Sequence, residues 1–182
     1  SLHDVVKLNE SFLNLQEDQI LDHLPTSYNI VGNLPYYITS SCIEHVLLSL
    51  KHWSTAYFMV QKEVAHRILA KPHSKDYGRL TVFCQLLAKV KLISNVPRGC
   101  FQPVPNVDSS FIKFTRNPPL DKSVLKHTLD LVKTGFSQRR KQLQGLLKKS
   151  YPGVDWQAGM NLINLKHTSR AENLTIDQWV KL

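Results

Sequence analysis

The sequence predicts an α/β fold followed by a small all-helical region, and three observations support this prediction. In the first part of the chain, short apolar runs bounded by turn-forming residues alternate with segments of helical periodicity. Residues 90–96 and 109–114 alternate apolar and polar side chains, as half-exposed antiparallel strands do. After Asn117-Pro118-Pro119, helical periodicity dominates. We therefore expect a sheet with helices on both faces in residues 1–117 and a helical domain in residues 118–182.

Each element follows from its pattern of apolar and turn-forming residues. Tyr28 to Gly32 is too short and too apolar for a surface helix, so it is expected to be a buried strand. Thr39, Ser40 or Ser41 is expected to cap a helix that ends near Lys51, because apolar residues recur there at helical spacing. The other expected elements are strands over residues 5–8 and 56–60, a weak amphipathic turn over 13–24 (closed by Pro25), helices over 63–70 and 80–88, a loop over 71–76, and helices around 124–132, 143–147 and 177–182.

Composition favours a nucleic acid as partner. Lys and Arg number 23 against 14 Asp and Glu, which gives a formal charge of +9 and a pI near 9.5. A basic but otherwise inert surface is the alternative. Cys42, Cys84 and Cys100 are odd in number and widely spaced, so they predict neither a disulfide framework nor a metal site. His45 and His52 have no cysteine or acid to complete a metal set.

Membrane and targeting signals are not visible in the sequence. No window approaches the ~20 apolar residues that a membrane span requires, and residues 1–9 lack the pattern of a signal peptide. A soluble, cytoplasmic protein is expected, or an organellar or nucleolar one if the source is eukaryotic. Because a strand-like segment begins almost directly after Ser1, we expect the chain to be a fragment.

Asn33-Leu34-Pro35-Tyr36 is the first candidate site, because ligands bind at the carboxyl ends of strands in α/β sheets. The amine of a ring such as adenine is a poor nucleophile, since its lone pair is delocalised. An enzyme that alkylates it must accept hydrogen bonds from the N–H groups and aim the lone pair at the donor. The Asn33 side-chain oxygen and the Pro35 carbonyl are the expected acceptors, and Tyr36 is expected to stack on the base. An ordinary strand-to-helix turn is the alternative.

The second candidate is the segment from Phe101 to Ser109, in which Pro103 and Pro105 stiffen the approach to a strand. Phe101 heads this rigid segment and is placed to cover the other face of a flat base. An ordinary core position is the alternative for any isolated phenylalanine.

Together the two motifs resemble those of the small-subunit ribosomal RNA adenine dimethyltransferase family, whose members use S-adenosylmethionine to dimethylate N6 of two adjacent adenines. The resemblance covers essentially the whole chain. It implies the C-terminal part of a Rossmann-like methyltransferase domain, then a helical RNA-binding domain. It also implies that the target adenine is held by Asn33, Leu34, Pro35, Tyr36 and Phe101. The other segments that carry the resemblance are Gln61-Lys62-Glu63-Val64 with Arg67, Tyr77-Gly78-Arg79-Leu80, Phe136 to Lys141, and Arg170 to Leu174.

The chain departs from the family pattern at the cofactor site. The glycine-rich loop and the ribose-binding acid of the family are expected upstream of residue 1, so the chain alone is expected to bind S-adenosylmethionine weakly or not at all and to be inactive. The acid that reads the cofactor's adenine corresponds to Glu10 or Ser11. Glu10 is the preferred candidate, with Asn33 also near the methyl donor.

A run of cations in the helical region is the expected RNA contact, because clustered cations on a helix suit phosphate groups. A solvated charged face is the alternative. The run lies in a stretch without acidic residues and consists of Arg139, Arg140, Lys141, Lys148 and Lys149.

The expected function is therefore dimethylation of adenine N6 in small-subunit ribosomal RNA with S-adenosylmethionine, by a monomer that holds no metal. One alternative is the macrolide-resistance methylase of large-subunit RNA, which shares the fold and a similar tetrapeptide. The other is a non-catalytic RNA-binding or ribosome-assembly factor on the same fold.

Overall fold

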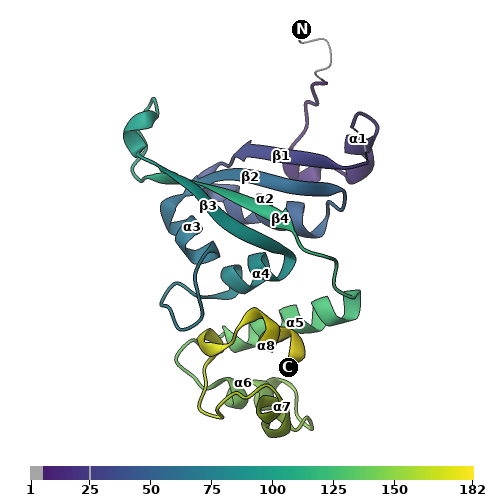
Figure 1. The fold of residues 1–182 in the computed structure, drawn as a ribbon, viewed down its shortest axis with the longest axis vertical. Coiled ribbons are helices and arrows are strands. Elements are labelled where there is room, and N and C mark those ends of the chain that lie inside the picture. The colour runs from purple at the N-terminus through teal and green to yellow at the C-terminus, as the bar shows by residue number, and fades with distance from the viewer. Residues whose placement is uncertain (1–5, 25) are drawn as a thin grey trace. The chain divides into compact units, whose positions relative to one another are not determined.

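The computed structural model describes residues 6–24 and 26–182, and the chain forms two compact units (Figure 1). The first unit extends to residue 65 and includes residues 88–116, and the second contains residues 66–87 and 117–182. The boundary expected after residue 117 is close to residue 116, where the chain leaves the first unit for the last time. Residues 66–87, however, pack with the C-terminal helices, because Ala70, Tyr77 and Val82 belong to that core. The division into two functional domains remains a prediction.

A four-stranded mixed sheet in the order β1-β2-β4-β3 forms the first unit. β1 (Tyr28–Asn33) is parallel to β2 (Trp53–Gln61). β4 (Ser109–Arg116) is antiparallel both to β2 and to β3 (Ala88–Val96). The strands expected over residues 28–32 and 56–60 and the late antiparallel pair are thus confirmed.

β1 differs from the buried strand that was expected. It lies at the edge of the sheet, only Tyr28 of its six residues is buried, and the Val31 side chain is 75% exposed. Apolar composition alone does not separate an apolar edge strand from a central one. The strand expected over residues 5–8 is wrong for residues 6–8, which form no strand, and Val5 lies outside the described residues.

One face of the sheet carries the core of this unit. β2 alternates buried Ala56, Phe58 and Val60 with half-buried neighbours, and the Phe58 ring meets Phe114 of β4 edge-on at 5.7 Å between centroids. In Figure 1, α2 (Thr39–Leu48) lies behind the sheet. The expectation of helices on both faces is not met within the described part of this unit, where no helix covers the opposite face.

The elements before and after β1 are short. The region expected to form a weak amphipathic turn over residues 13–24 contains the end of η1 (Phe12–Asn14) and α1 (Glu17–Leu21), and Pro25 lies outside the described residues. α2 has Ile38 as its N-cap, so none of the three expected hydroxyl groups caps it, and it ends at Leu48. The other short elements are η2 (Tyr36–Ile38), α3 (Lys62–Ile68) and η3 (Arg98–Cys100).

The second unit is helical, as expected. Its core contains the fully or almost fully buried Tyr77, Leu131, Trp156 and Trp179. The predicted helices near residues 80–88, 124–132, 143–147 and 177–182 are confirmed. The sequence prediction missed α7, although its N-cap Asp155 accepts hydrogen bonds from two backbone N–H groups, which is a start signal. The elements are α4 (Arg79–Leu87), α5 (Lys122–Gly135), α6 (Leu143–Ser150), α7 (Trp156–Leu162), η4 (Ala171–Asn173) and α8 (Ile176–Lys181).

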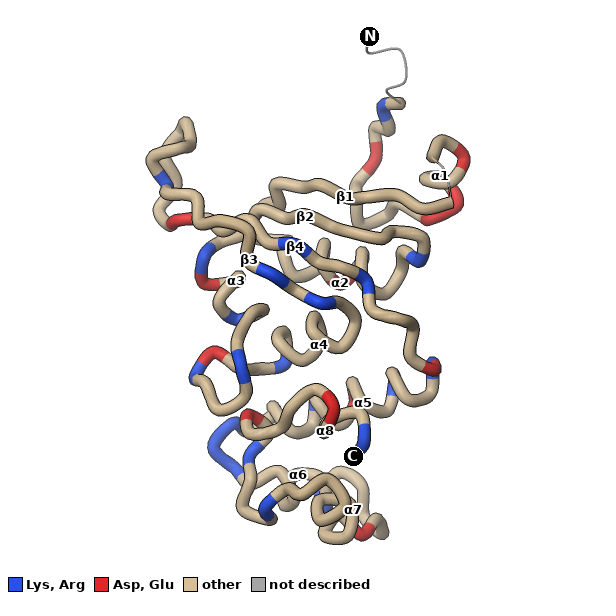
Figure 2. The backbone as a smooth tube through the Cα atoms, in the orientation of Figure 1, with Lys and Arg blue, Asp and Glu red and all other residues tan. Residues whose placement is uncertain are grey.

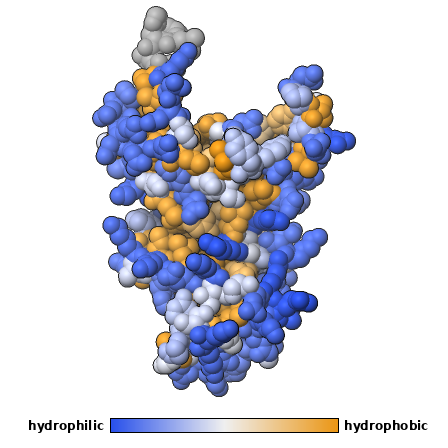
Figure 3. All heavy atoms as spheres, turned by 180° about the vertical axis from the view of Figure 1, so that it is seen from behind, coloured by the Kyte–Doolittle hydropathy of each residue, from blue (hydrophilic) through white to orange (hydrophobic). Residues whose placement is uncertain are grey.

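Hydrophilic and hydrophobic side chains are mixed on the surface seen in Figure 3, where orange residues are interspersed among blue ones. Among the described residues, no helix is long and apolar enough to cross a membrane. The same residues contain no cluster of three or more metal-ligating side chains.

Candidate functional site

The two candidate segments border one cavity of about 400 Å³. The register of the sheet explains why they meet. Gln61, the last residue of β2, pairs with Ser109, the first residue of β4, so the β3–β4 connection reaches the edge of the sheet where β1 ends. The residues that line the cavity are Asn33, Leu34, Pro35, Tyr36, Phe101, Gln102, Pro103 and Pro105.

The backbone on the β1 side is fixed by hydrogen bonds. The Leu34 N–H donates to the Met59 carbonyl at 3.1 Å, and the Leu34 side chain is buried. The Pro35 carbonyl accepts from the Thr39 hydroxyl at 2.9 Å and from the Ile38 N–H at 3.2 Å. A carbonyl oxygen has two lone pairs, so that of Pro35 is fully used by the start of α2.

This geometry changes the expected pair of acceptors. Asn33 is exposed at the end of β1 with its side chain free of hydrogen bonds to described residues. The Leu34 carbonyl also accepts none from them. Among the described residues, the Leu34 carbonyl beside the cavity thus remains available as an acceptor, whereas the Pro35 carbonyl that was expected from the sequence does not.

Aromatic side chains form two walls of the cavity. Tyr36 is 41% exposed, and its hydroxyl lies 3.4 Å from the Ser109 hydroxyl. Phe101 is half-buried and follows the 3-10 turn η3. Sequence reasoning missed Tyr37, which is 87% exposed directly after the cavity residue Tyr36. The two adjacent tyrosines of η2 have different surroundings, since Tyr36 lines the cavity and Tyr37 does not.

The expected cofactor residues are not brought together. Glu10 is exposed, its carboxylate accepts a hydrogen bond from Gln19, and it does not line the cavity that contains Asn33. Ser11 is the residue before η1. The seven glycines of the chain include no Gly-x-Gly pair. The described residues therefore do not form a site that fits S-adenosylmethionine.

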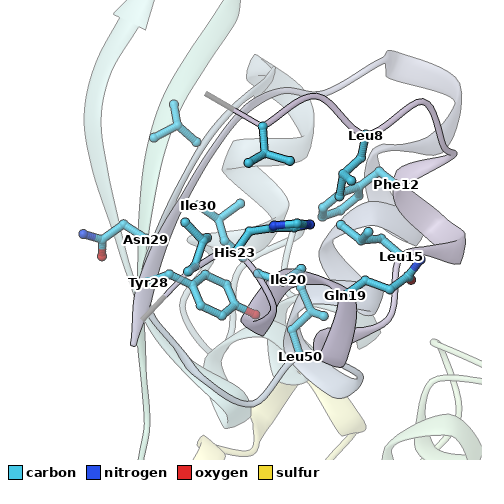
Figure 4. A pocket seen from close by; sticks show the side chains of 13 residues that line it. Leu8, Phe12, Leu15, Gln19, Ile20, His23, Tyr28, Asn29, Ile30 and Leu50 are labelled. Carbon is cyan, nitrogen blue, oxygen red and sulfur yellow. The ribbon is translucent and has the colours of Figure 1, made fainter. Parts of the chain in front are cut away.

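A second cavity, of about 340 Å³, lies along β1 and is mainly apolar. Figure 4 shows Phe12 and Leu15 on one side of it and Tyr28 and Ile30 of β1 on the other. None of the predicted site residues lines it.

Glu17 fixes the connection between α2 and β2 in this region. Its carboxylate accepts from the backbone N–H groups of Lys51 and His52 at 2.7–2.8 Å and from the Tyr28 hydroxyl at 3.0 Å. Burial by itself would raise the pKa of Glu17, but these hydrogen bonds outweigh it and lower the pKa.

The cations of the helical unit divide into two kinds. Arg139 is held by other residues of its unit: it pairs with Glu172 at 3.0 Å and donates to the carbonyls of Ser74, Lys75 and Tyr77. The side chains of the others are likewise exposed but form no hydrogen bond or ion pair with described residues, and Figure 2 shows the blue segment just before α6 that includes Arg139, Arg140 and Lys141. These exposed cations are Arg140, Lys141, Lys148 and Lys149.

Comparison with known proteins gives a consistent result. The family model described as ribosomal RNA adenine dimethylase matches residues 4–182. A ribosomal RNA small subunit methyltransferase A of Chlamydia felis is 38% identical over 156 residues, which are 84% of this chain and 55% of that protein. The chain thus spans somewhat more than half the length of this relative.

Two solved structures share the fold. A dimethyladenosine transferase from Plasmodium falciparum aligns with a TM-score of 0.72 and 25% identity over 87% of this chain and 66% of that one. The 23S rRNA methyltransferase ErmE aligns with a TM-score of 0.70 and 26% identity over 96% of this chain and 68% of that one. The prediction of a Rossmann-like methyltransferase fold with a helical C-terminal region is confirmed.

Proposed function

The chain belongs to the ribosomal RNA adenine dimethylase family, and on that premise we propose that it holds the target adenine during N6 dimethylation of two adjacent adenines in small-subunit ribosomal RNA. The observation that carries this proposal is the cavity in which the end of β1 meets the β3–β4 connection. A volume of about 400 Å³ suits one flat base, and the cavity offers two free acceptors and aromatic rings from two elements.

The acceptors are the side-chain oxygen of Asn33 and the carbonyl of Leu34. Each accepts one hydrogen bond from the N6 amine of the base, which draws that nitrogen toward tetrahedral geometry and directs its lone pair away from the ring. The Leu34 carbonyl is held in place because its own residue is anchored to β2 through the Met59 carbonyl. The base must leave its stack in the RNA to reach them.

The aromatic walls hold the plane of the base. Stacking on an aromatic side chain is worth about 1–3 kcal/mol per base and tolerates any base, so discrimination falls to the two acceptors. Adenine presents an amine to both acceptors, whereas the O6 atom of guanine presents only lone pairs. We assign stacking to Tyr36 and Phe101, and leave Tyr37 as a contact for the flanking nucleotide.

S-adenosylmethionine, which carries a methyl group on a sulfonium, supplies the electrophile in this proposal. Asn33 remains its proposed contact in this chain, whereas Glu10 does not line the cavity that contains Asn33. The exposed cations Arg140, Lys141, Lys148 and Lys149 supply affinity for the RNA backbone. A cytoplasmic location and a monomeric state remain predictions from the sequence.

The large-subunit alternative has the support of one similar fold, that of ErmE. We favour the small subunit because the similar proteins of Chlamydia felis, Mycoplasma mobile and Saccharophagus degradans are all small-subunit methyltransferases by name. A non-catalytic RNA-binding protein is the alternative from another class, and the cavity with two unused acceptors argues against it.

Methylation of purified ribosomal subunits tests this proposal. A complete protein that contains these residues is incubated with S-adenosylmethionine labelled in its methyl group and with small or large subunits separately. Label in adenine N6 of the small subunit supports the proposal. Label only in the large subunit points to the macrolide-resistance type, and RNA binding without label on either subunit points to the non-catalytic alternative.

A further inference from the structure

Asp108 and the first two residues of β4, Ser109 and Ser110, connect four parts of the first unit. Ser110 donates to the side-chain oxygen of Asn95 at 2.9 Å and so joins the start of β4 to the end of β3. Asp108 and Ser109 instead reach the two sides of the adenine cavity. All three are buried or half-buried.

Asp108 holds the side that carries Phe101. Its Oδ1 accepts a hydrogen bond from the Arg98 N–H at 3.0 Å, and its Oδ2 lies 3.7 Å from the Lys62 ammonium. The Phe101 N–H in turn donates to the Arg98 carbonyl at 3.2 Å. Since Arg98 is bonded on both sides, its position fixes that of Phe101, three residues further along.

Ser109 holds the side that carries Tyr36. Its side chain is only 1% exposed, and its hydroxyl lies 3.4 Å from the hydroxyl of Tyr36. A second hydrogen bond holds the chain just before Ser109, because the Lys62 N–H donates to the Asp108 carbonyl at 3.0 Å. Two adjacent residues at the start of one strand are therefore linked to both walls of the cavity.

We propose that Asp108 and Ser109 act as one clasp that sets the separation and tilt of the two aromatic walls, and hence how well a flat base is positioned. The clasp deepens the proposed function and rests on it. Asp108 and Ser109 are positioning residues, since they act through Phe101 and Tyr36 rather than on the base. Misplacement of a reacting group by about 1 Å can lower a rate about a hundredfold, so small shifts of the walls matter.

Within the clasp, the hydrogen bond to Arg98 is the decisive link. Lys62 and Asp108 are each 42% exposed, and an ion pair so exposed contributes little. The bond to the Arg98 N–H closes the connection between β3 and β4 and needs only an acceptor oxygen. Asp108→Asn retains such an oxygen, whereas Asp108→Ala removes it.

Hydrogen exchange tests the clasp without any need for catalysis. In the complete protein, Asp108→Ala is expected to speed exchange of the amides of residues 98–101 about tenfold, in proportion to the removal of one hydrogen bond. Asp108→Asn is expected to leave that exchange near the wild-type rate. Ser110→Ala is the matched control, because it removes a hydrogen bond of the same strand that involves neither wall.

Steady-state kinetics of methyl transfer supply the second measurement. Asp108→Ala and Ser109→Ala are expected to lower kcat about tenfold to a hundredfold with an unchanged KM for the RNA, because the basic helical unit supplies most of the affinity. Ser110→Ala is expected to lower kcat less than threefold. Ser109→Ala combined with Tyr36→Phe is expected to cost no more than either alone, since both remove the same bond.

The outcomes separate the clasp from the proposed function. Faster amide exchange in Asp108→Ala but not in Asp108→Asn supports the clasp. If the wild-type protein methylates neither subunit, only the proposed function fails, and this exchange result still supports the clasp. Unchanged exchange in Asp108→Ala overturns the clasp. If the wild-type protein is active, the clasp is also overturned when Asp108→Ala and Ser109→Ala retain the wild-type kcat. It is overturned as well when Ser110→Ala lowers kcat as much as they do.

Discussion

The guanidinium of Arg139 lies 3.0 Å from the Glu172 carboxylate and also donates to three backbone carbonyls of the loop before α4. One side chain thus joins three segments of the helical unit that are distant in sequence: the loop of residues 74–77, the turn before α6, and η4. Its neighbour Arg140 is exposed and has no such partners among the described residues. The two adjacent arginines therefore have different roles.

Replacement of Arg139 should reduce stability. Arg139→Ala removes the donor to three carbonyl groups and the Glu172 carboxylate, but Arg139 is itself 47% exposed, so the free energy of unfolding should fall by only about 0.5–1.5 kcal/mol. Urea denaturation followed by circular dichroism measures this change. Arg140→Ala serves as the control and should lie within about 0.5 kcal/mol of the wild type. Equal stability of the two variants would contradict the structural role of Arg139.

The exposed cations should govern the salt dependence of RNA binding. Replacing Arg140 and Lys141 by Ala should weaken binding to a fragment of small-subunit ribosomal RNA. The slope of log K against log salt should fall by about 1 for each phosphate group that the variant no longer binds. Fluorescence anisotropy at several salt concentrations measures the slope. Lys126→Ala, an exposed cation on α5, is the control. A slope that stays at the wild-type value would exclude these two residues from the RNA interface.

The Asn33 side chain should be needed for catalysis rather than for RNA affinity. In a complete protein, Asn33→Ala removes one of the two acceptors for the amine and should lower single-turnover methyl transfer by about a hundredfold or more. Salt-sensitive RNA binding, measured in parallel, should change less than about twofold, because backbone phosphates dominate affinity. If the variant retained the wild-type rate, holding of the amine by Asn33 would be wrong.

Gly135 is required by close packing in the helical core. A Cβ atom at this position would lie 2.7 Å from Trp179 and 2.8 Å from Leu143, which are both fully buried. Gly135→Ala should therefore lower the free energy of unfolding by about 1–3 kcal/mol through overpacking, despite the better helix propensity of alanine. Thermal denaturation measures the loss.

Gly145 provides the matched control in α6. A Cβ atom there meets nothing within 4 Å, so Gly145→Ala should stabilise the protein by up to about 1 kcal/mol through helix propensity alone. Opposite signs for the two glycine-to-alanine changes are expected. A stabilised Gly135→Ala variant would contradict the packing.

Stability should depend on pH through Glu17. Its pKa in the folded protein lies below the ordinary value of 4.5, so the folded state binds fewer protons than the unfolded chain as the pH falls through this range. The stabilisation is therefore complete above about pH 4.5 and is lost as the pH falls through the folded pKa. Urea denaturation between about pH 3 and 7 should show a shallower acid dependence for Glu17→Gln than for the wild type. Identical slopes would remove Glu17 as a source of the acid sensitivity.

Most elements were predictable because their signals are local. Alternation in β3 and β4, the apolar run of β1 and helical spacing in α2 and α5 each depend on neighbours within a few residues. The edge position of β1 was not predictable, because burial depends on which strand pairs with it, and no local pattern records that pairing. The short helix α7 was missed because seven residues carry too little periodicity.

The candidate site shows the same division between local and tertiary information. Residue types made Asn33-Leu34-Pro35-Tyr36 and Phe101 candidates for one base site, with an ordinary turn and a core position as the alternatives, and the family resemblance favoured the base site. Only the tertiary structure decided which hydrogen-bonding groups remain available to a ligand. The start of α2 takes up the Pro35 carbonyl, and the helical core takes up Arg139, because hydrogen bonds formed between distant segments consume donors and acceptors that the sequence presents as free.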